Sequence, residues 1–354
     1  MQTKKRDLKF SDAIREATDL CMAKDPAVYV LGLGAPDPKG IFGTTLGLQK
    51  KYGEERVMDM PTSENGMTGV AIGSALAGMR PVMTHQRLDF ALLSLEQIVN
   101  QAAKWHYMFG GKMKVPLVIR MIMGRGWGQG PQHSQSLHAW FAHVPGLKVV
   151  MPAFPYDAKG LLISSIEDNN PVIFLEHRWL HNILGRVPEG IYRVPIGAPQ
   201  LIREGSDITF VAASYMSLEA LKAAELLAKD GISAEVIDLR TLAPLDDTMI
   251  LESIHKTGRL IAADIGWKTG GFGAGIISRV VEKRFQNLKC APTLVASPDI
   301  PTPTSHALAK YYYPTAFNLV NAAKKMMGVS LSKQAASPDS LILDVPDPSF
   351  KGPF

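Results

Sequence analysis

The sequence predicts an α/β protein of two domains with parallel or mostly parallel sheets flanked by helices. Short, β-branched apolar runs alternate with helical patterns along most of the chain, which is typical of parallel sheets. The runs are continuously apolar, as expected for strands that helices cover on both faces. The chain has 354 residues, enough for about two domains of ordinary size.

The first domain is predicted over residues 1–185. Helices are expected over residues 11–23, where Ser11 is a candidate N-cap, over 65–78, which is rich in Gly and Ala, and over 94–108, where Ser94 and Gln97 have capping-box spacing. The candidate strands are 28–33, 80–84, 115–122, 147–151 and 171–176.

Frequent Gly and Pro residues between positions 178 and 206 indicate an inter-domain linker, placed at 186–206. A second domain is predicted over 207–328, with strands at 207–213, 233–239, 259–264 and 292–296 and helices at 217–230, 247–256 and 273–286. Gly231 is expected to close the first of these helices. The last segment, 329–354, combines Ser and Pro with few apolar residues, which indicates an extended tail.

Composition excludes several classes of protein. The 38 Lys and Arg against 33 Asp and Glu give a net charge of +5, and the basic residues are scattered, so nucleic-acid binding is not expected. Two distant cysteines exclude a disulfide scaffold and fit a reducing compartment. No run of about 18 apolar residues and no signal-peptide core occurs, so we expect a cytoplasmic protein that neither crosses nor binds a membrane.

Glu64 is the first candidate site residue. It lies in the sequence Ser63-Glu64-Asn65-Gly66, between a strand-like segment and a Gly-rich helix. Ligands of open α/β sheets bind outside the carboxyl ends of the strands, so Glu64 is positioned to meet one. Taken alone, an acid favoured by the helix dipole is the better interpretation. Repeated glycines along this helix, Gly66, Gly69, Gly73 and Gly78, suggest close approach to another backbone, such as a second subunit.

Two loops are further candidates. Loop 124–136 contains four glycines and presents His133, Ser134, Gln135 and Ser136 after a buried strand. A single His is more often structural than catalytic, and no neighbouring acid completes a serine triad. The run 270–275, GGFGAG, lacks the spacing of a dinucleotide-binding loop, which favours a tight strand–helix connection.

Several of these segments, taken together and in order, resemble one family. The segments are PTSENG (61–66), Asp89-Phe90, QIVNQAAK (97–104), QHSQS (132–136), PGLKVV (145–150), DAKGL (157–161), VIDLRTL (236–242) and TGGFGA (269–274). From about residue 8 to 326 the chain resembles the beta subunit of the thiamine-diphosphate-dependent 2-oxo acid dehydrogenase component, of the pyruvate, branched-chain or acetoin dehydrogenase type. This family belongs to the transketolase-like superfamily, which implies a pyrimidine-binding domain and a transketolase C-terminal domain.

The resemblance also implies a cofactor and partners. In the family, an alpha subunit holds the diphosphate of thiamine diphosphate and its Mg²⁺ through a G-D-G motif, which this chain lacks. We therefore expect an α2β2 heterotetramer that can serve a lipoyl-bearing acyltransferase. A structural potassium site is implied at Asp168 and Asn170.

Four residues acquire expected roles from the same resemblance. Glu64 matches the glutamate that hydrogen-bonds the pyrimidine ring nitrogen and favours the imino tautomer, which requires a carboxylate. Phe90 matches an aromatic residue that packs on the pyrimidine, and Gln86 matches a polar neighbour. His133 matches the histidine that faces the reactive carbon and donates to the developing alkoxide.

The sequence departs from the family pattern at two positions near the expected site. Gly32-Leu33-Gly34-Ala35 stands where an acidic pair is usual, and Arg87 replaces an aromatic residue. A guanidinium at position 87 can bind a carboxylate or phosphate of the substrate, although Arg87 can equally extend to solvent or to Asp89.

The expected activity is decarboxylation of a 2-oxo acid with acyl transfer to lipoyl. The alternatives are a split transketolase-like or carboligating enzyme that passes a two-carbon or acyl unit to an aldehyde or ketone, and a non-catalytic scaffold. Retention of Glu64, Phe90 and His133 argues against the scaffold, whereas Leu33 favours it.

Overall fold

The computed structural model describes residues 6–124 and 128–329, and its contacts divide the chain into two units. The first contains residues 6–123 and 140–196. The second contains residues 197–329 together with 128–139, a segment that the predicted first domain included. Residues 125–127 of the His133 loop and nearly all of the predicted tail lie outside the described residues.

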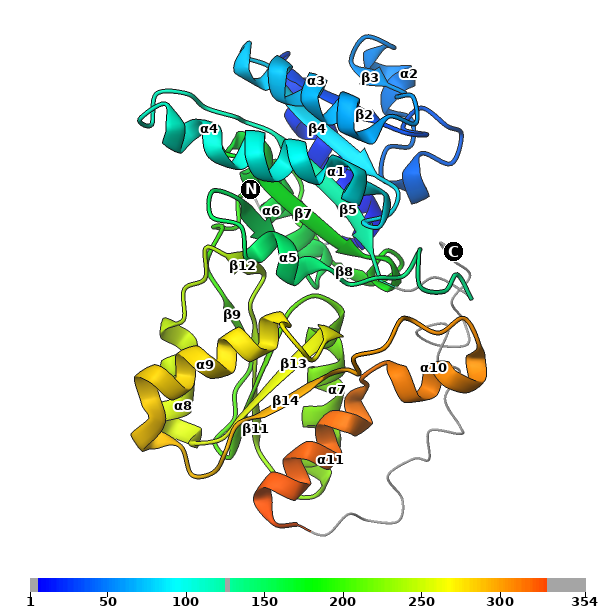
Figure 1. Cartoon of the computed structure of the whole chain (residues 1–354). Coiled ribbons are helices and arrows are strands. Elements are labelled where there is room, and N and C mark those ends of the chain that lie inside the picture. The colour runs from blue at the N-terminus through cyan, green and yellow to red at the C-terminus, as the bar shows by residue number, and fades with distance from the viewer. Residues whose placement is uncertain (1–5, 125–127, 330–354) are drawn as a thin grey trace. The chain divides into compact units, whose positions relative to one another are not determined.

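The first unit is a parallel sheet between two layers of helices (Figure 1). Its strands are ordered β6-β7-β5-β4-β2-β3, and all these neighbouring pairs are parallel, whereas β1 and β8 form a separate antiparallel pair. Helices α1 and α6 pack together, whereas α3 packs on β4 and the segments that follow it. The strands are β1 (Asp7–Lys9), β2 (Val28–Gly32), β3 (Val57–Met58), β4 (Arg80–His85), β5 (Val118–Met123), β6 (Lys148–Val150), β7 (Val172–His177) and β8 (Leu184–Arg186). The helices are α1 (Phe10–Lys24), η1 (Ile41–Gly43), α2 (Leu48–Tyr52), α3 (Glu64–Leu76), η2 (Phe90–Ser94), η3 (Gln97–Ala102), α4 (Ala103–Met108), α6 (Pro155–Glu167) and η4 (Arg178–Leu180). Helix α5 (His138–Ala142) begins in the segment that belongs to the second unit.

The second unit has its own sheet, ordered β14-β13-β10-β11-β9. All pairs are parallel except β9 with β11. Helices α7 and α11 pack together, as do α8 and α9 (Figure 1). The strands are β9 (Gln200–Arg203), β10 (Ile208–Ala212), β11 (Ala234–Asp238), β12 (Thr241–Ala243), β13 (Leu260–Trp267) and β14 (Thr293–Ser297). The helices are α7 (Tyr215–Lys229), α8 (Thr248–Thr257), α9 (Phe272–Arg284), η5 (Phe285–Asn287), α10 (His306–Tyr312) and α11 (Ala316–Met327).

The predicted α/β class with mostly parallel sheets is confirmed. Strands β2, β4, β7, β10 and β11 are completely buried or nearly so, which explains their continuous apolar sequences. The predicted linker is not free of structure, because β9 pairs with β11. Among the described residues, no helix has the length and apolarity needed to cross a bilayer.

Two predicted helix starts are wrong, for identifiable reasons. Helix α1 begins at Phe10 rather than after a Ser11 cap, because the carbonyls of Ile183 and His181 accept from the backbone amides of Phe10 and Ser11 (3.0 and 3.1 Å). The expected helix over 94–108 is a 3-10 turn, a π-helical segment and a short α-helix in succession. Ser94 does not cap it, because its hydroxyl lies 2.9 Å from Thr68 Oγ1.

Candidate functional site

The carboxyl ends of β2, β3 and β4 meet at one edge of the first sheet. The strands are parallel and in register, with Gly32 opposite Thr84 and Leu31 opposite Met58. Glu64 begins α3 shortly after β3, and Gln86 follows β4 directly. Two of the predicted site residues therefore follow neighbouring strands at the edge where α/β sheets bind ligands.

Glu64 is a buried carboxylate at the N-terminus of α3. It is 6% exposed, and its carboxylate has no hydrogen-bond or ion-pair partner among the residues described. The helix dipole stabilises a negative charge at this position but does not replace a hydrogen-bond donor. Because no described residue donates to it, the carboxylate is available to accept a hydrogen bond from a ligand.

Thr68 joins the helix of Glu64 to the segment of Phe90. It lies one turn along α3, and its hydroxyl donates to the backbone oxygen of Glu64 (2.7 Å). The Thr68 hydroxyl oxygen also lies 2.9 Å from Oγ of Ser94, the last residue of η2, which Phe90 begins. The first turn of α3 is thereby held against the Phe90 segment. Sequence reasoning missed Thr68, since a Thr inside a helix gives no such signal.

The turn after β2 holds Gln86 in place. Gln86 Nε2 donates to the carbonyl of Leu33 (2.9 Å), and Asp59 Oδ1 accepts from the amide of Gly34 (2.9 Å). A Cβ on Gly34 would lie 2.8 Å from both Gln86 Nε2 and Asp37 Oδ2, so only glycine fits there. The turn that lacks the acidic pair in its own sequence thus lies close to two other carboxylates, Asp37 and Asp59, which sequence reasoning missed.

His85 and Arg87 flank Gln86 and differ in charge. His85 is 3% exposed, and burial lowers its pKa to about 4, so the imidazole is neutral near pH 7. Its Nε2 has no hydrogen-bond partner among the described residues. Arg87 is half-buried; burial lowers its pKa, and the charge of Asp89 opposes that shift. The influence of the Asp89 charge is consistent with the structural alternative for Arg87, and the substrate role stays a prediction.

A buried ion pair supports the same strands from the core. Arg120 on β5 donates from Nε and Nη2 to the two oxygens of Glu176 on β7, at 2.6 and 3.0 Å, and both side chains are fully buried. His181 Nε2 lies 3.3 Å from Glu176 Oε2. Burial acts to raise the pKa of Glu176, but the charge and hydrogen bonds of Arg120 and the proximity of His181 outweigh it, so the pKa lies below its usual value.

His133 lies in the second unit, in the segment 128–139, which we call the His133 loop. His133 is partly exposed, and the neighbouring Ser134 is buried with a hydroxyl that has no partner among the described residues. At the end of the loop, His138 Nε2 lies 2.9 Å from Asp264 Oδ1 on β13. His133 and Glu64 thus belong to different units. The His138–Asp264 pair was missed because its members are far apart in sequence.

Asp264 organises the glycine-rich turn that precedes α9. Its Oδ2 accepts from the amide of Gly273 and its Oδ1 from that of Gly266, both at 2.8 Å. Burial acts to raise the pKa of Asp264, but the charge and hydrogen bond of His138 and the two amides lower it overall. Gly271 is the N-cap of α9. The run 270–275 is therefore the tight strand–helix connection that its spacing favoured.

Asp168 and Asn170 lie at the opposite, amino edge of the first sheet, between α6 and β7. Asp168 Oδ1 accepts from the amide and side chain of Asn170 (2.8 and 2.9 Å), and its other oxygen pairs with Lys148. Burial acts to raise the pKa of Asp168, but these hydrogen bonds lower it overall. The described residues contain no group of three or more His, Cys, Asp or Glu side chains placed to hold a metal ion. A potassium site here remains a prediction.

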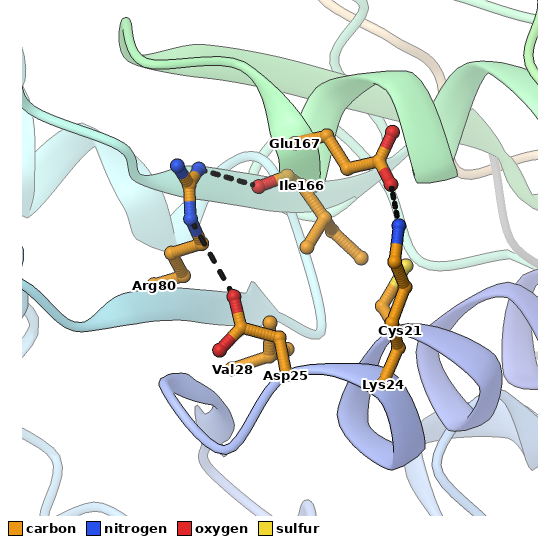
Figure 2. Close-up of a pocket in the computed structure, with 7 residues that line it drawn as sticks. All are labelled: Cys21, Lys24, Asp25, Val28, Arg80, Ile166 and Glu167. Atoms are coloured by element: carbon orange, nitrogen blue, oxygen red, sulfur yellow. Dashed lines mark hydrogen bonds and ion pairs between the residues drawn. The ribbon is translucent and has the colours of Figure 1, made fainter.

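A cavity of about 170 Å³ also opens at this amino edge (Figure 2). Its charged groups pair with one another: Lys24 with Glu167 at 3.0 Å, and Arg80 with Asp25 at 3.8 Å. Burial raises the pKa of the Cys21 thiol to about 12, so it is not a nucleophile near neutral pH. The cavity lies at the other end of β2 and β4 from Glu64 and offers no unpaired charge to a ligand.

Comparison with known proteins gives a consistent set of similarities. Residues 6–182 match the transketolase pyrimidine-binding domain, and residues 197–319 match the transketolase C-terminal domain. The chain is 45% identical over 332 residues to the acetoin:2,6-dichlorophenolindophenol oxidoreductase subunit beta of Cupriavidus necator, covering 91% of this chain and 98% of that one. It is 41% identical over 315 residues to the pyruvate dehydrogenase E1 component subunit beta of Rickettsia felis, covering 89% and 97%. A split-gene transketolase, described as an inactive beta4 tetramer, has the same fold, with a TM-score of 0.72, 23% identity and coverage of 92% and 99%.

Proposed function

The chain belongs to the transketolase-like family of beta subunits of thiamine-dependent 2-oxo acid dehydrogenase components, and from this membership we propose that it is the beta half of an α2β2 enzyme. The relatives named above are beta subunits of pyruvate and acetoin enzymes. The proposed reaction is decarboxylation of a 2-oxo acid with acyl transfer to lipoyl. An alpha subunit provides the G-D-G motif for the diphosphate and Mg²⁺, since this sequence has none.

The position of Glu64 is the observation that carries the proposal: the residue is 6% exposed at the carboxyl edge of the sheet, and its carboxylate has no partner among the described residues. Thiamine diphosphate, when bound, would supply a nucleophilic carbon for the substrate carbonyl and a thiazolium ring that accepts the electrons of the bond being broken. Glu64 would hydrogen-bond the pyrimidine ring nitrogen and hold a proton there. Phe90 packs on the ring, and Gln86, fixed by the Leu33 carbonyl, presents its remaining polar atoms to it.

His133 and Arg87 are assigned to the substrate. His133 donates a proton to the substrate oxygen on which negative charge develops. Arg87 binds the carboxylate of the substrate or an anionic group of the acceptor, for which the planar guanidinium is suited.

The exposed side of α3 supports a partner chain. Val70 is 57% exposed, and a Cβ on Gly73 would meet no atom within 4 Å. The described residues therefore give no reason for glycine at position 73. A second chain packed closely on this face provides one, and we assign the face to subunit contact.

The direct experiment is to co-purify the chain with an alpha subunit that carries a G-D-G motif and to assay a panel of substrates. The panel contains pyruvate, branched-chain 2-oxo acids, acetoin and ketose phosphates, with an artificial electron acceptor. We expect turnover of a 2-oxo acid that requires both thiamine diphosphate and Mg²⁺. An assembled complex that binds the cofactor but turns over no member of the panel would contradict the proposal and favour a scaffold.

A second candidate reaction differs in the donor or acceptor. Subunits of acetoin oxidoreductases from two organisms are 45% and 39% identical to this chain. Cleavage of a hydroxyketone, or transfer of its acyl unit to another carbonyl compound, would use the same residues. Turnover of acetoin in preference to every 2-oxo acid tested would support this candidate.

A further inference from the structure

In the second sheet, the strands that follow β10 are added first on one side of it and later on the other. From β10 the chain passes through α7 to β11 on one side, and it later returns to place β13 on the other side of β10. The carboxyl edge at such a switch point is the usual ligand position of an open α/β sheet. Asp264 lies there, one residue beyond Ala263, the last residue of β13 in register with β10.

In this chain, the position is filled from within. His138, which is 2% exposed, places Nε2 2.9 Å from Asp264 Oδ1. An ionised carboxylate can only accept, so the imidazole donates to it. Two further acceptor sites of Asp264 are used by the amides of Gly266 and Gly273.

Close packing at two points holds the loop to the second unit. A Cβ on Gly266 would lie 2.9 Å from His138 Cε1 and 3.2 Å from the carbonyl oxygen of Ser136. A Cβ on Gly130 would lie 2.5 Å from Thr304 Oγ1, and Gly130 has a φ of +70°. His133 lies between these two contacts.

We infer that the His138–Asp264 pair positions the His133 loop for the reaction, with His138 as a positioning residue rather than a catalytic one. The inference rests on the proposed function for its catalytic consequence. A hydrogen bond to a buried carboxylate fixes both the orientation of the imidazole and the backbone that carries it. Loss of this bond releases one end of the loop while the contact of Gly130 with Thr304 remains.

The test compares His138→Leu with His138→Gln in the assembled α2β2 complex. Leu removes the donor, whereas Gln keeps an Nε2 donor at a similar distance from the backbone. His143→Leu, at an exposed position nearby, is the matched control. Hydrogen–deuterium exchange of peptides covering 128–139 measures the loop without reference to activity, and kcat, KM and deuterium exchange at the thiazolium carbon measure the reaction.

For His138→Leu we expect faster amide exchange in the loop and a kcat lowered by about 10- to 100-fold, since misplacement by about 1 Å can cost about 100-fold. KM and exchange at the thiazolium carbon should stay near wild-type values, and His138→Gln should restore loop protection and most of kcat. Wild-type loop exchange in His138→Leu, or a Gln variant as impaired as the Leu variant, would overturn the inference. If the wild-type complex is inactive on every substrate, the proposed function fails, and the amide exchange still decides whether His138 holds the loop.

Discussion

At the scale of single residues, Glu64 should govern turnover without governing assembly. Replacing Glu64 with Ala removes a proton-transfer group from the cofactor edge, and we expect turnover to fall by about 100-fold or more. Deuterium exchange at the thiazolium carbon is the direct measurement, and it should slow to a similar degree. Size-exclusion chromatography should show an intact complex.

The matched control is Glu55→Ala, which removes an exposed carboxylate close in sequence. It should leave turnover and thiazolium exchange as they are in the wild type. Unchanged thiazolium exchange in Glu64→Ala would show that Glu64 has no role in the mechanism and is only an acid in the first turn of α3.

His133 should show the opposite pattern. In His133→Ala, exchange at the thiazolium carbon should stay close to normal, because the imidazole acts on the substrate side of the cofactor. Decarboxylation or acyl transfer should slow, which single-turnover measurements with the chosen 2-oxo acid can detect. The role is misassigned if thiazolium exchange collapses while the later steps survive; His143→Ala serves as the control, since His143 is exposed.

Arg87 tests whether the departure at this position alters substrate choice. Its half-buried guanidinium, beside Asp89, can still direct its donors to an anionic substrate. Arg87→Met should raise KM for the true anionic substrate several-fold while cofactor affinity stays unchanged. Steady-state kinetics measure KM, and calorimetry measures cofactor affinity. Arg186→Met, at an exposed position, is the control. An unchanged KM for every anionic substrate would leave Arg87 a structural residue paired with Asp89.

Some site residues could be predicted from the sequence because they sit at recognisable junctions. Glu64 stands where a strand-like segment passes into a helix, and Gln86 follows an apolar strand. The roles of Asp59, Thr68 and the His138–Asp264 pair could not be predicted from the sequence, since they depend on contacts made across the fold. A polar residue in an ordinary local pattern does not reveal a distant partner.

At the scale of elements, the Arg120–Glu176 pair joins β5 and β7 at full burial. Glu176→Gln leaves the Arg120 guanidinium without its carboxylate, and breaking a buried pair costs about 3 to 5 kcal/mol. We expect the urea midpoint of the assembled protein at pH 7 to fall accordingly. Replacing both members, as Arg120→Met with Glu176→Leu, should cost much less because no unpaired charge remains.

This contribution should depend on pH in one direction. The folded-state pKa of Glu176 is lowered, so its stabilising effect is complete above the unfolded pKa of about 4.3 and is lost as pH falls through the folded value. The difference in stability between wild type and Glu176→Gln should therefore be constant from pH 7 to 5 and shrink at lower pH. His181 lies 3.3 Å from the same carboxylate, and its contribution can be separated by repeating the series in His181→Gln. A difference that grows as pH falls would contradict this sign.

The elements divide into those that local sequence determines and those that packing determines. Strands β2, β10 and β11 were predictable because complete burial requires continuous apolar residues. The π-helical segment Gln97–Ala102 was not, since apolar spacing does not separate it from an α-helix. The start of α1 depends on the carbonyls of His181 and Ile183, which no pattern near Ser11 could reveal.

At the scale of the whole molecule, the candidate site residues are divided between the two units of the chain. The described residues place Glu64 in the first unit and the His133 loop in the second, although the loop falls within the first half of the sequence. Sequence periodicity predicts helices and strands, but it does not predict which unit a loop packs on. The proposed chemistry therefore depends on contacts such as His138–Asp264 that attach this loop to the second sheet.

The same scale yields a prediction about the isolated chain. Thiamine diphosphate carries most of its charge on the diphosphate, which needs Mg²⁺ and ligands for it, and this sequence contains no G-D-G motif. Glu64, Gln86 and Phe90 can satisfy only the pyrimidine, so the chain alone should bind the cofactor weakly and without dependence on Mg²⁺. Calorimetry with the purified chain, with and without the alpha subunit, measures this directly. Because the missing ligands must come from elsewhere, low-micromolar, Mg²⁺-dependent binding by the chain alone would show that it is not a beta half.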